Sequence, residues 1–494
     1  MVSLRSLPLY GLAAILLFAA GKLFYNLFLH PLRKYPGPFF AGSTRAYYLF
    51  YDVRGLSHWK VNEWHQKYGP VIRIAPDELS YTDSRAWPAI YGFPNKEGTG
   101  NFEKDAQWWN KTVSGVVNIL DADDDGHRRM RRLQNPAFSD KALRAQESVI
   151  CGYASLLVHK LHGLCSGGSS GDGSAVVDMT AWYNFTTFDI IGDLAFGEPF
   201  YCLQNAEWHW WLQAVFDIFK AGTMLRAARR FPEPLATLLC LFIPRKLIQT
   251  RKEQFAFGIE RVDKRLQQTT DRPDFNGEKG MTIEETYTAA QVLIVAGSET
   301  SATALCGSTY LLLSNPSTLA RLTAEVRAAF SSEAEILPHS TAALPYLNAV
   351  VEEALRLCPP GPGTFPRRVP EGGRVVCGQF VPGGVSVGVH QVSTHRSPEN
   401  FREPLEFRPE RWLGDPKFEG DNRACFREID FPSISAASRC SLAYAETKTV
   451  LSRMVWNFDM KMHPDSIGWL DRQKTYTTWQ KDEMKVEIRP RARV

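Results

Sequence analysis

The most apolar part of the chain lies near its N-terminus. Residues 7–29 are dominated by Leu, Ile, Phe and Ala, and Lys22 is the only charged residue among them. This length is enough to cross a bilayer as a helix, and a lysine side chain can reach back to the interface. Arg5 precedes the stretch and Arg33-Lys34 follow it, so the charges favour an uncleaved anchor at residues 1–30 with the rest of the chain in the cytosol. The alternative is a cleaved signal peptide.

Prolines follow the apolar stretch directly. Pro31, Pro36 and Pro38, together with Gly37, lie in residues 31–40. Because proline fixes φ and stiffens the chain, we expect a hinge there, between the anchor and one globular domain at residues 41–494.

The hydrophobic pattern of the remaining chain predicts a mainly helical domain with a minor, segregated β portion. Residues 283–313 have the pattern of one long helix, which Asn315-Pro316 would end. Two further helical stretches are more apolar than solvent-facing helices need to be, so they either pack in the core or form a lipid-facing entrance for an apolar substrate. These stretches are residues 208–219 and 235–243, and short strands are expected at residues 71–75, 79–81, 374–376 and 385–389.

Composition excludes some classes of function. The net charge of +4 over 494 residues is small, so it gives no argument for nucleic-acid binding. Nine cysteines are scattered without a CxxC pair or a zinc-type spacing, which favours reduced thiols over a disulfide framework.

The middle of the long predicted helix carries an acid followed by a hydroxyl, Glu299-Thr300, after Ala296-Gly297. Glycine inside a helix costs about 1 kcal/mol against alanine, so its presence needs a reason. One interpretation is that Gly297 lets a flat ligand approach the backbone while Glu299 and Thr300 relay protons to a buried centre. The other is an ordinary small-residue helix crossing with Glu299 in solvent.

A second motif pairs Glu353 with Arg356, three residues apart on one helix face. Such pairs are usually exposed, but this one lies near the end of a mostly apolar helix and should be buried. Arg411, in the segment Pro409-Glu410-Arg411-Trp412, can join the pair because a guanidinium offers five donors.

A third motif, at residues 123–132, begins with acidic residues and continues with basic ones. This order of charges complements the dipole of a helix. His127 and Arg131 lie one turn apart and could bind a buried dianion. The alternative is a solvated basic face.

The order of these motifs, followed by a cysteine before a helix, resembles the cytochrome P450 family. The likeness is greatest to the fungal, membrane-anchored type that modifies secondary metabolites. It covers nearly the whole chain after the anchor, and residues 135–139 and 188–197 share it.

The resemblance implies haem (iron protoporphyrin IX) with Cys440 as the thiolate ligand of the iron. It also implies that Glu299 and Thr300 deliver protons, that Ala296 and Gly297 line the oxygen groove, and that Glu353, Arg356 and Arg411 form a structural triad. The implied cofactor-binding residues are completed by His127, Arg131, Arg367 and Arg439.

The loop around Cys440 departs from the family pattern. Residues 431–442 lack both expected glycines, Arg439 adjoins the cysteine, and Cys440 lies too close to the following helix. Cys425, the other nearby thiol, fits the family order poorly. Three interpretations stay open: an unusual working loop, an error in the gene model, or a degenerate relative poor in haem. The intact motifs elsewhere favour the first two.

The resemblance implies a monooxygenase that oxidises an apolar small molecule in fungal secondary metabolism, anchored in the endoplasmic reticulum with a cytosolic catalytic domain. Electrons would come from NADPH through a separate P450 reductase, and Arg128, Arg129 and Arg132 could dock this acidic partner. A haem-dependent isomerase, dehydratase or ring-closing enzyme is the alternative. The sequons at Asn110 and Asn184 would stay unmodified in the cytosol.

Overall fold

The computed structural model describes residues 7–92, 102–109, 115–167, 173–267, 280–422 and 442–492. The helices are α1 (Leu7–Phe24), α2 (Phe39–Ser43), α3 (Ala46–Asp52), α4 (Ser57–Tyr68), α5 (Ala86–Tyr91), α6 (Asp124–Gln134), α7 (Asp140–Gly167), α8 (Met179–Phe196), α9 (Cys202–Asn205), α10 (Trp210–Arg229), α11 (Leu235–Cys240), α12 (Arg245–Leu266), α13 (Ile283–Ser314), α14 (Pro316–Ala329), α15 (Pro338–Thr341), α16 (Pro345–Leu357), α17 (Gln391–His395), α19 (Leu442–Asn457) and α20 (Trp469–Arg472). The strands are β1 (Val71–Ala75), β2 (Glu78–Tyr81), β3 (Glu103–Lys104), β4 (Ala175–Asp178), β5 (Arg367–Arg368), β6 (Arg374–Val376), β7 (Gln379–Val381), β8 (Ser386–Val389), β9 (Phe458–Met462), β10 (Lys474–Tyr476), β11 (Thr478–Gln480) and β12 (Lys485–Pro490).

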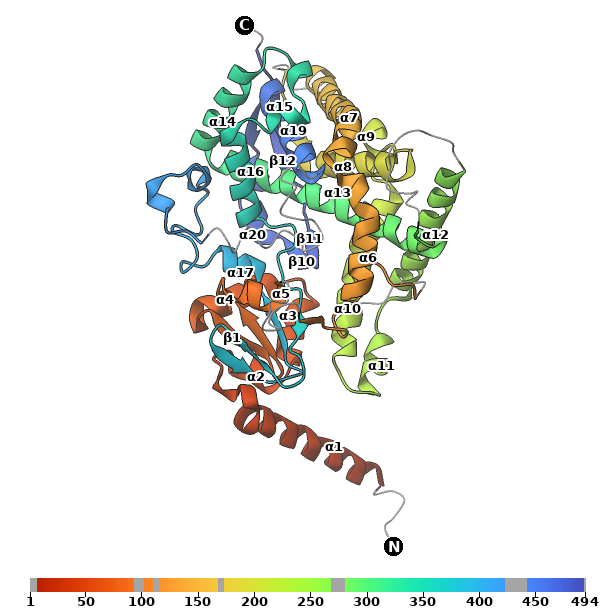
Figure 1. Ribbon diagram of the computed structural model, residues 1–494, viewed down its shortest axis with the longest axis vertical. Helices are drawn as coiled ribbons and strands as arrows, with labels where there is room; N and C mark the ends of the chain where they lie inside the picture. The colour runs from red at the N-terminus through yellow and green to blue at the C-terminus, as the bar shows by residue number, and fades with distance from the viewer. Residues whose placement is uncertain are drawn as a thin grey trace.

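Helix α13 crosses the middle of the helical part of the molecule (Figure 1). It begins with a capping box, in which the Thr282 side chain accepts from the Glu285 backbone and the Glu285 side chain accepts from the Thr282 backbone. Asn315 ends it and Pro316 starts α14. The long helix expected from the sequence is therefore confirmed, to within one residue at its end.

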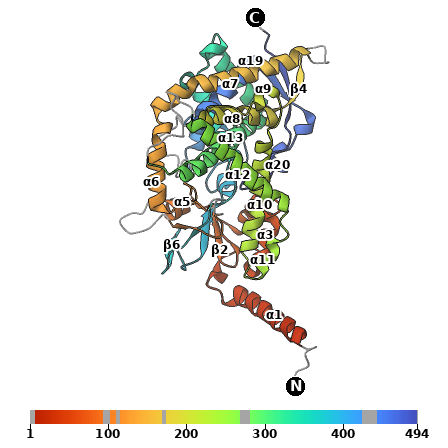
Figure 2. The same cartoon turned by 90° about the vertical axis from the view of Figure 1, so that its right-hand side faces the viewer.

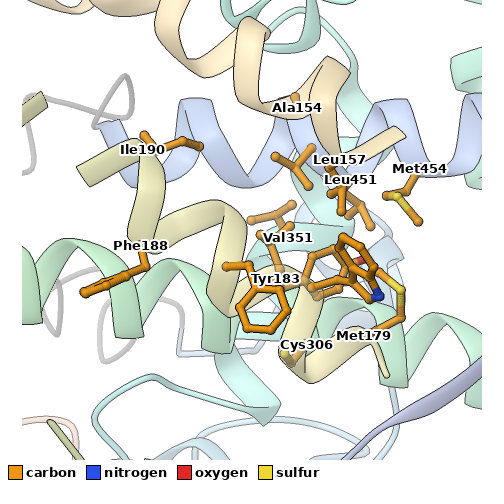
Figure 3. Packing of buried hydrophobic residues seen from close by; sticks show 14 of the residues in the cluster. Ala154, Leu157, Met179, Tyr183, Phe188, Ile190, Cys306, Val351, Leu451 and Met454 are labelled. Atoms are coloured by element: carbon orange, nitrogen blue, oxygen red, sulfur yellow. The ribbon is translucent and has the colours of Figure 1, made fainter. Parts of the chain in front are cut away.

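The main hydrophobic core surrounds this helix. Figure 3 shows Leu157 of α7, Tyr183 of α8, Cys306 of α13, Val351 of α16 and Leu451 of α19 converging from five helices. Each is at most 1% exposed. The Tyr183 hydroxyl reaches the Thr309 hydroxyl of α13 at 2.8 Å, which satisfies both polar groups inside the core.

The main β sheet lies at one end of the molecule, away from the C-terminus, whereas β12 lies towards the C-terminus (Figure 1). The main sheet has the strand order β1-β2-β8-β5-β3, with β2 and β8 parallel and the other pairs antiparallel. Three smaller sheets pair β10 with β11, β6 with β7, and β4 and β9 with β12. The four predicted strands are found within one residue of their expected bounds, so the mainly helical fold with a minor β portion is confirmed. The strands are not all segregated at one end, because β4, β9 and β12 form a sheet in the helical part.

Helix α1 projects from the β end of the molecule (Figures 1 and 2). Its residues from Ala13 onward are exposed, and the apolar helical stretch runs on to Leu29. In the described part of the chain, α13 alone has the length and hydropathy of a membrane span, and more than half of its apolar window is buried in the core.

Residues 31–40, expected to be a hinge, pack on the body. Leu32 is fully buried, and the Arg73 backbone N–H donates to the Pro36 carbonyl at 2.7 Å. A Cβ at Gly37 would lie 2.4 Å from the Arg73 carbonyl oxygen, so only glycine permits this close approach. The connection to α1 is thus an ordered part of the fold.

The two very apolar stretches behave differently. Helix α10 buries Trp211 and Leu212 in the core, whereas the segment at α11 leaves Leu241 and Phe242 exposed by 76% and 77%. The α11 segment lies at the same end of the molecule as α1 (Figure 1). The sequon residue Asn184 is 1% exposed inside α8, so the folded chain offers no glycan acceptor there, and Asn110 is outside the described residues.

Buried histidines predict acid sensitivity of the fold. Burial lowers the pKa of His58 and of His395 to about 3, and that of His65 to about 4. The unfolded chain protonates these rings near pH 6.5 and the folded chain does not. Their contribution to the unfolding free energy is therefore complete above pH 6.5, and it is lost as pH falls towards 4 for His65 and towards 3 for His58 and His395. Each site should cost about 2 kcal/mol of unfolding free energy at pH 5. Urea unfolding at pH 7.5 and 5 measures this loss.

A matched pair of variants isolates the effect. His58→Gln should reduce the loss between pH 7.5 and 5 by about 2 kcal/mol, since His65 and His395 still contribute. His339→Gln, at a side chain 69% exposed, should leave the loss unchanged. Equal pH dependence in His58→Gln and the unaltered chain would contradict the prediction.

Candidate active site

One face of α13 is open although the helix lies in the core. Ala296 is exposed and Thr300 half-buried, while Ser298, Glu299 and Ser301 are buried. Ala296 and Thr300 are one turn apart and so share a face. The Thr300 hydroxyl donates to the Ala296 carbonyl at 2.6 Å. The part of the chain that the structure describes therefore leaves this face, with its hydroxyl, accessible.

Gly297 lies on another side of the helix, against α8. A Cβ there would lie 2.7 Å from Cδ1 and 2.9 Å from Cγ1 of Ile191. The glycine therefore allows α8 to cross α13 closely, as the small-residue interpretation expected. In the described structure its free space is filled by Ile191.

Glu299 is buried and ion-paired, whereas the small-residue interpretation expected it to lie in solvent. Its side chain is 1% exposed and forms an ion pair with Lys481, whose side chain is also 1% exposed. The Thr303 hydroxyl donates to Glu299 Oε1 at 3.4 Å, and Lys481 Nζ donates to Thr303 at 3.1 Å. Burial raises the pKa of Glu299, although Lys481 opposes the shift.

Glu353, Arg356 and Arg411 meet in a fully buried network, each with 0% of its side chain exposed. Arg356 donates to both Glu353 oxygens, at 2.9 and 2.8 Å, and Arg411 Nε lies 3.3 Å from Oε2. The Trp412 indole donates to Oε2 at 2.9 Å and the Arg408 backbone N–H to Oε1 at 3.0 Å. The carboxylate is thus saturated by charge-assisted hydrogen bonds.

The two arginines also hold the segment that follows α17. Arg356 donates to the carbonyls of His395 and Pro404, at 2.7 Å each, and Arg411 forms an ion pair with buried Asp421. Asp421 lies just before residues 423–441. The network therefore fixes the chain at the point where it enters the segment that contains Arg439, Cys440 and Cys425, which are outside the described residues.

Three cationic side chains and one histidine gather where α6 meets β3 and β5. Lys104 and Arg367 are paired residues of β3 and β5, and His127 and Arg131 come from α6. Burial lowers the pKa of His127, and Lys104, Arg131 and Arg367 lower it further, against Asp124. Burial and Arg367 likewise lower the pKa of Lys104 to about 8.

Neutral backbone carbonyls accept hydrogen bonds from two of these cations. Lys104 Nζ donates to the Ala122 carbonyl at 2.6 Å and Arg367 Nη1 to the Phe102 carbonyl at 2.9 Å. Arg367 Nε is buried without a hydrogen-bond partner among the described residues. Half-buried cations held mainly by carbonyls fit a ligand with two negative charges.

Sequence comparisons identify the family. A cytochrome P450 family model matches residues 36–487. The chain is 43% identical over 490 residues to the cytochrome P450 monooxygenase aclL of Aspergillus oryzae, covering 98% of each chain. It is 41% identical over 480 residues to astJ of the same organism, covering 95% of this chain and 94% of that one. It is 39% identical over 492 residues to the averantin hydroxylase of Dothistroma septosporum, covering 97% of this chain and 91% of that one. The chain belongs to the cytochrome P450 family.

This P450 is accordingly an oxidoreductase of the monooxygenase type, and haem is the cofactor that its family implies. The residues present fit that group: the cation cluster suits two carboxylates, and Ala296 and Thr300 are accessible on one face of α13. The resemblance stated from the motifs is confirmed.

Three residues of the site were missed by sequence reasoning. Lys481 and Lys104 are isolated lysines without a motif, and Asp421 is one acid in a polar stretch. Each has a role only through a partner far away in the sequence. A local pattern therefore carries no signal for them.

Removing the charge of Glu353 should destabilise this P450 strongly. Glu353→Gln would leave Arg356 buried without a carboxylate and Arg411 with Asp421 alone, which we expect to cost about 3–5 kcal/mol of unfolding free energy. Glu352→Gln, at the neighbouring half-buried position of α16, should cost less than about 1 kcal/mol. Urea unfolding of both variants measures the difference, and equal losses would contradict the account of the network.

Proposed function

We propose that this P450 inserts one oxygen atom into an apolar small molecule bound at the open face of α13. The observation that carries the proposal is the accessible Thr300 hydroxyl of α13, which lies next to the buried residues Ser298, Glu299 and Ser301. When bound through a thiolate, haem supplies the oxidising chemistry, because the thiolate raises electron density at the iron and favours O–O cleavage. The similarity to fungal P450 monooxygenases, including one named averantin hydroxylase, supports a secondary-metabolite substrate and a hydroxylation.

In this proposal Thr300 and Glu299 handle protons. The Thr300 hydroxyl donates to Ala296, yet its oxygen can still accept a hydrogen bond, so it can pass a proton at the open face. Glu299, one residue earlier, exchanges protons on the inner side of the helix. The small side chain of Ala296 leaves this face of α13 accessible, and Gly297 lets α8 pack closely against another side of the helix.

We assign the cofactor carboxylates to the cation cluster. Arg131, Arg367 and His127 would hold them, with Lys104 added from the structure. Cys440 would provide the thiolate, with Arg439 beside it. Glu353, Arg356 and Arg411 would keep the chain that leads into this loop in place.

The proposal includes a membrane and a redox partner. Residues 1–30 would anchor the chain in the endoplasmic reticulum membrane with the catalytic domain in the cytosol. The exposed apolar residues Leu241 and Phe242, at the same end as α1, support contact with lipid. Electrons would come from NADPH through a P450 reductase.

A carbon-monoxide difference spectrum of the reduced, full-length protein tests the function. We expect a Soret band at the position typical of thiolate ligation, and its loss in Cys440→Ser. Absence of the band from the unaltered protein would refute the enzyme proposal.

Variants of the cation cluster sharpen this test. Arg131→Met and Arg367→Met should each weaken haem retention about tenfold, because a charged hydrogen bond of about 1.5–3 kcal/mol is lost. Arg128→Met, on the same helix but exposed and paired with Asp125, should retain haem normally. The rate of haem transfer to excess apomyoglobin measures retention, and three equal rates would refute the assignment.

Reductase docking makes a separate prediction. Arg128 and Arg132 are exposed on α6, whereas Arg129 is already paired with Glu285 of α13. Arg128→Glu/Arg132→Glu should raise the KM for the reductase several-fold and reduce its salt dependence, because rim charges act mainly on association. Haem content should not change. Unchanged reductase kinetics would exclude this face as the docking surface.

A further inference from the structure

The ion pair of Glu299 joins two distant parts of the chain. Glu299 belongs to the central helix α13, whereas Lys481 directly follows β11 near the C-terminus. Both side chains are 1% exposed, so neither charge is screened by solvent. A charge in such a place persists only with a partner.

The backbone around Lys481 is fixed on both sides. Two residues earlier, the Trp479 indole donates to the Pro359 carbonyl at 2.7 Å. One residue later, the Asp482 carbonyl accepts from the Trp469 indole and from the Thr180 hydroxyl, at 2.9 Å each. The fold therefore places the Lys481 ammonium next to Glu299, and Lys481 is not a mobile surface side chain.

The other titratable groups named around this ion pair do not compete with Lys481 for Glu299. Burial raises the pKa of Cys358 to about 12 and that of Cys306 well above its usual range, so both thiols are neutral near pH 7. Asp178, which also acts on Cys306, accepts from the backbone N–H groups of Thr180 and Met484. Among the described residues, Lys481 is the cation that pairs with Glu299.

The two oxygens of Glu299 have different surroundings. Oε1 is held by Lys481 and by the Thr303 hydroxyl. Oε2 is buried and has no hydrogen-bond partner among the described residues. A buried carboxylate oxygen without a donor is costly, so Oε2 is ready to accept a proton or a water hydrogen.

We propose that Lys481 is a positioning residue for oxidation: it keeps Glu299 ionised, with Oε1 anchored and Oε2 free to take up and pass on a proton. The inference rests on the function proposed above, in which Glu299 and Thr300 handle protons. The proton binds to Oε2 and leaves from Oε2, and the ammonium of Lys481 keeps its three protons, so the pair is unchanged after each transfer.

Loss of the cation has a definite consequence. Burial alone favours the neutral acid, so without Lys481 the Glu299 carboxyl should hold its proton near pH 7. A neutral carboxyl has lost the basic oxygen that accepts a proton. The ionisation of Glu299 should then move to higher pH, and proton delivery should fall with it.

Infrared spectroscopy of the full-length protein tests this without turnover. Lys481→Met removes the charge at similar length. Burial raises the pKa of Glu446 to about 8, so the unaltered protein already has one carboxylic C=O band at pH 7.5, and in Lys481→Met we expect an added band beyond it. Lys481→Arg, which keeps the charge, should lack the added band, and so should Glu299→Gln/Lys481→Met. Lys485→Met, at an exposed lysine on β12, is the control and should also lack it. No added band in Lys481→Met would overturn the proposal.

Turnover with reductase gives the second readout. In Lys481→Met the limb of the kcat profile that reports the ionised acid should move up by about one pH unit or more, and product per NADPH should fall roughly tenfold or more. Lys481→Arg should restore both. An unshifted profile in Lys481→Met would overturn the proposal.

A double-mutant cycle covers the case in which Lys481→Met does not fold. Glu299→Gln/Lys481→Met leaves no unpaired buried charge, and its pH profile should equal that of Glu299→Gln alone. A further change caused by Lys481→Met in the Glu299→Gln background would refute the proposal. Failure of the proposed function is distinguishable, because it appears as a missing Soret band while the infrared band can still be read.

Discussion

The buried carboxylate of Glu353 is the constraint on which much of the molecule depends. A negative charge with no solvent contact is tolerable only because Arg356, Arg411 and Trp412 saturate it. The same guanidiniums donate outward to backbone carbonyls, so one network joins α16 to the irregular chain after α17. The chain that leads into residues 423–441 is therefore held at a fixed point by the ion pair of Arg411 with Asp421.

The central helix meets a different requirement on each side. Core packing and the close crossing of α8 at Gly297 hold it in place, while the face with Ala296 and Thr300 remains open. Glu299 lies between these two sides, and its buried charge is stabilised by Lys481. The helix therefore combines rigid positioning with an ionisable group beside the open face.

Local patterns predicted the elements well, because a helix or strand is specified by residues close together in sequence. The bounds of α13, the four strands and the burial of the Glu353–Arg356 pair could all be read from spacing and flanking residues. Motif order also identified the family. Partners chosen through tertiary structure were not accessible: nothing near Lys481, Lys104 or Asp421 indicates which distant charge each one meets. The side of α13 on which Gly297 lies also depended on where α8 packs, and the order in residues 31–40 depended on contacts with β1.

The attachment of the N-terminal helix has a consequence for how the enzyme would sit on a bilayer. Arg73 Nη1 donates to the Asn26 carbonyl at 2.9 Å, and Asn26 Nδ2 donates to the Ser43 carbonyl at 2.8 Å, so the end of the apolar helix is fastened to the sheet. With this helix embedded as proposed, the body could not swivel freely about its tether. Leu241 and Phe242 would then face the lipid in every molecule, and a substrate dissolved in the bilayer would always approach from the same side.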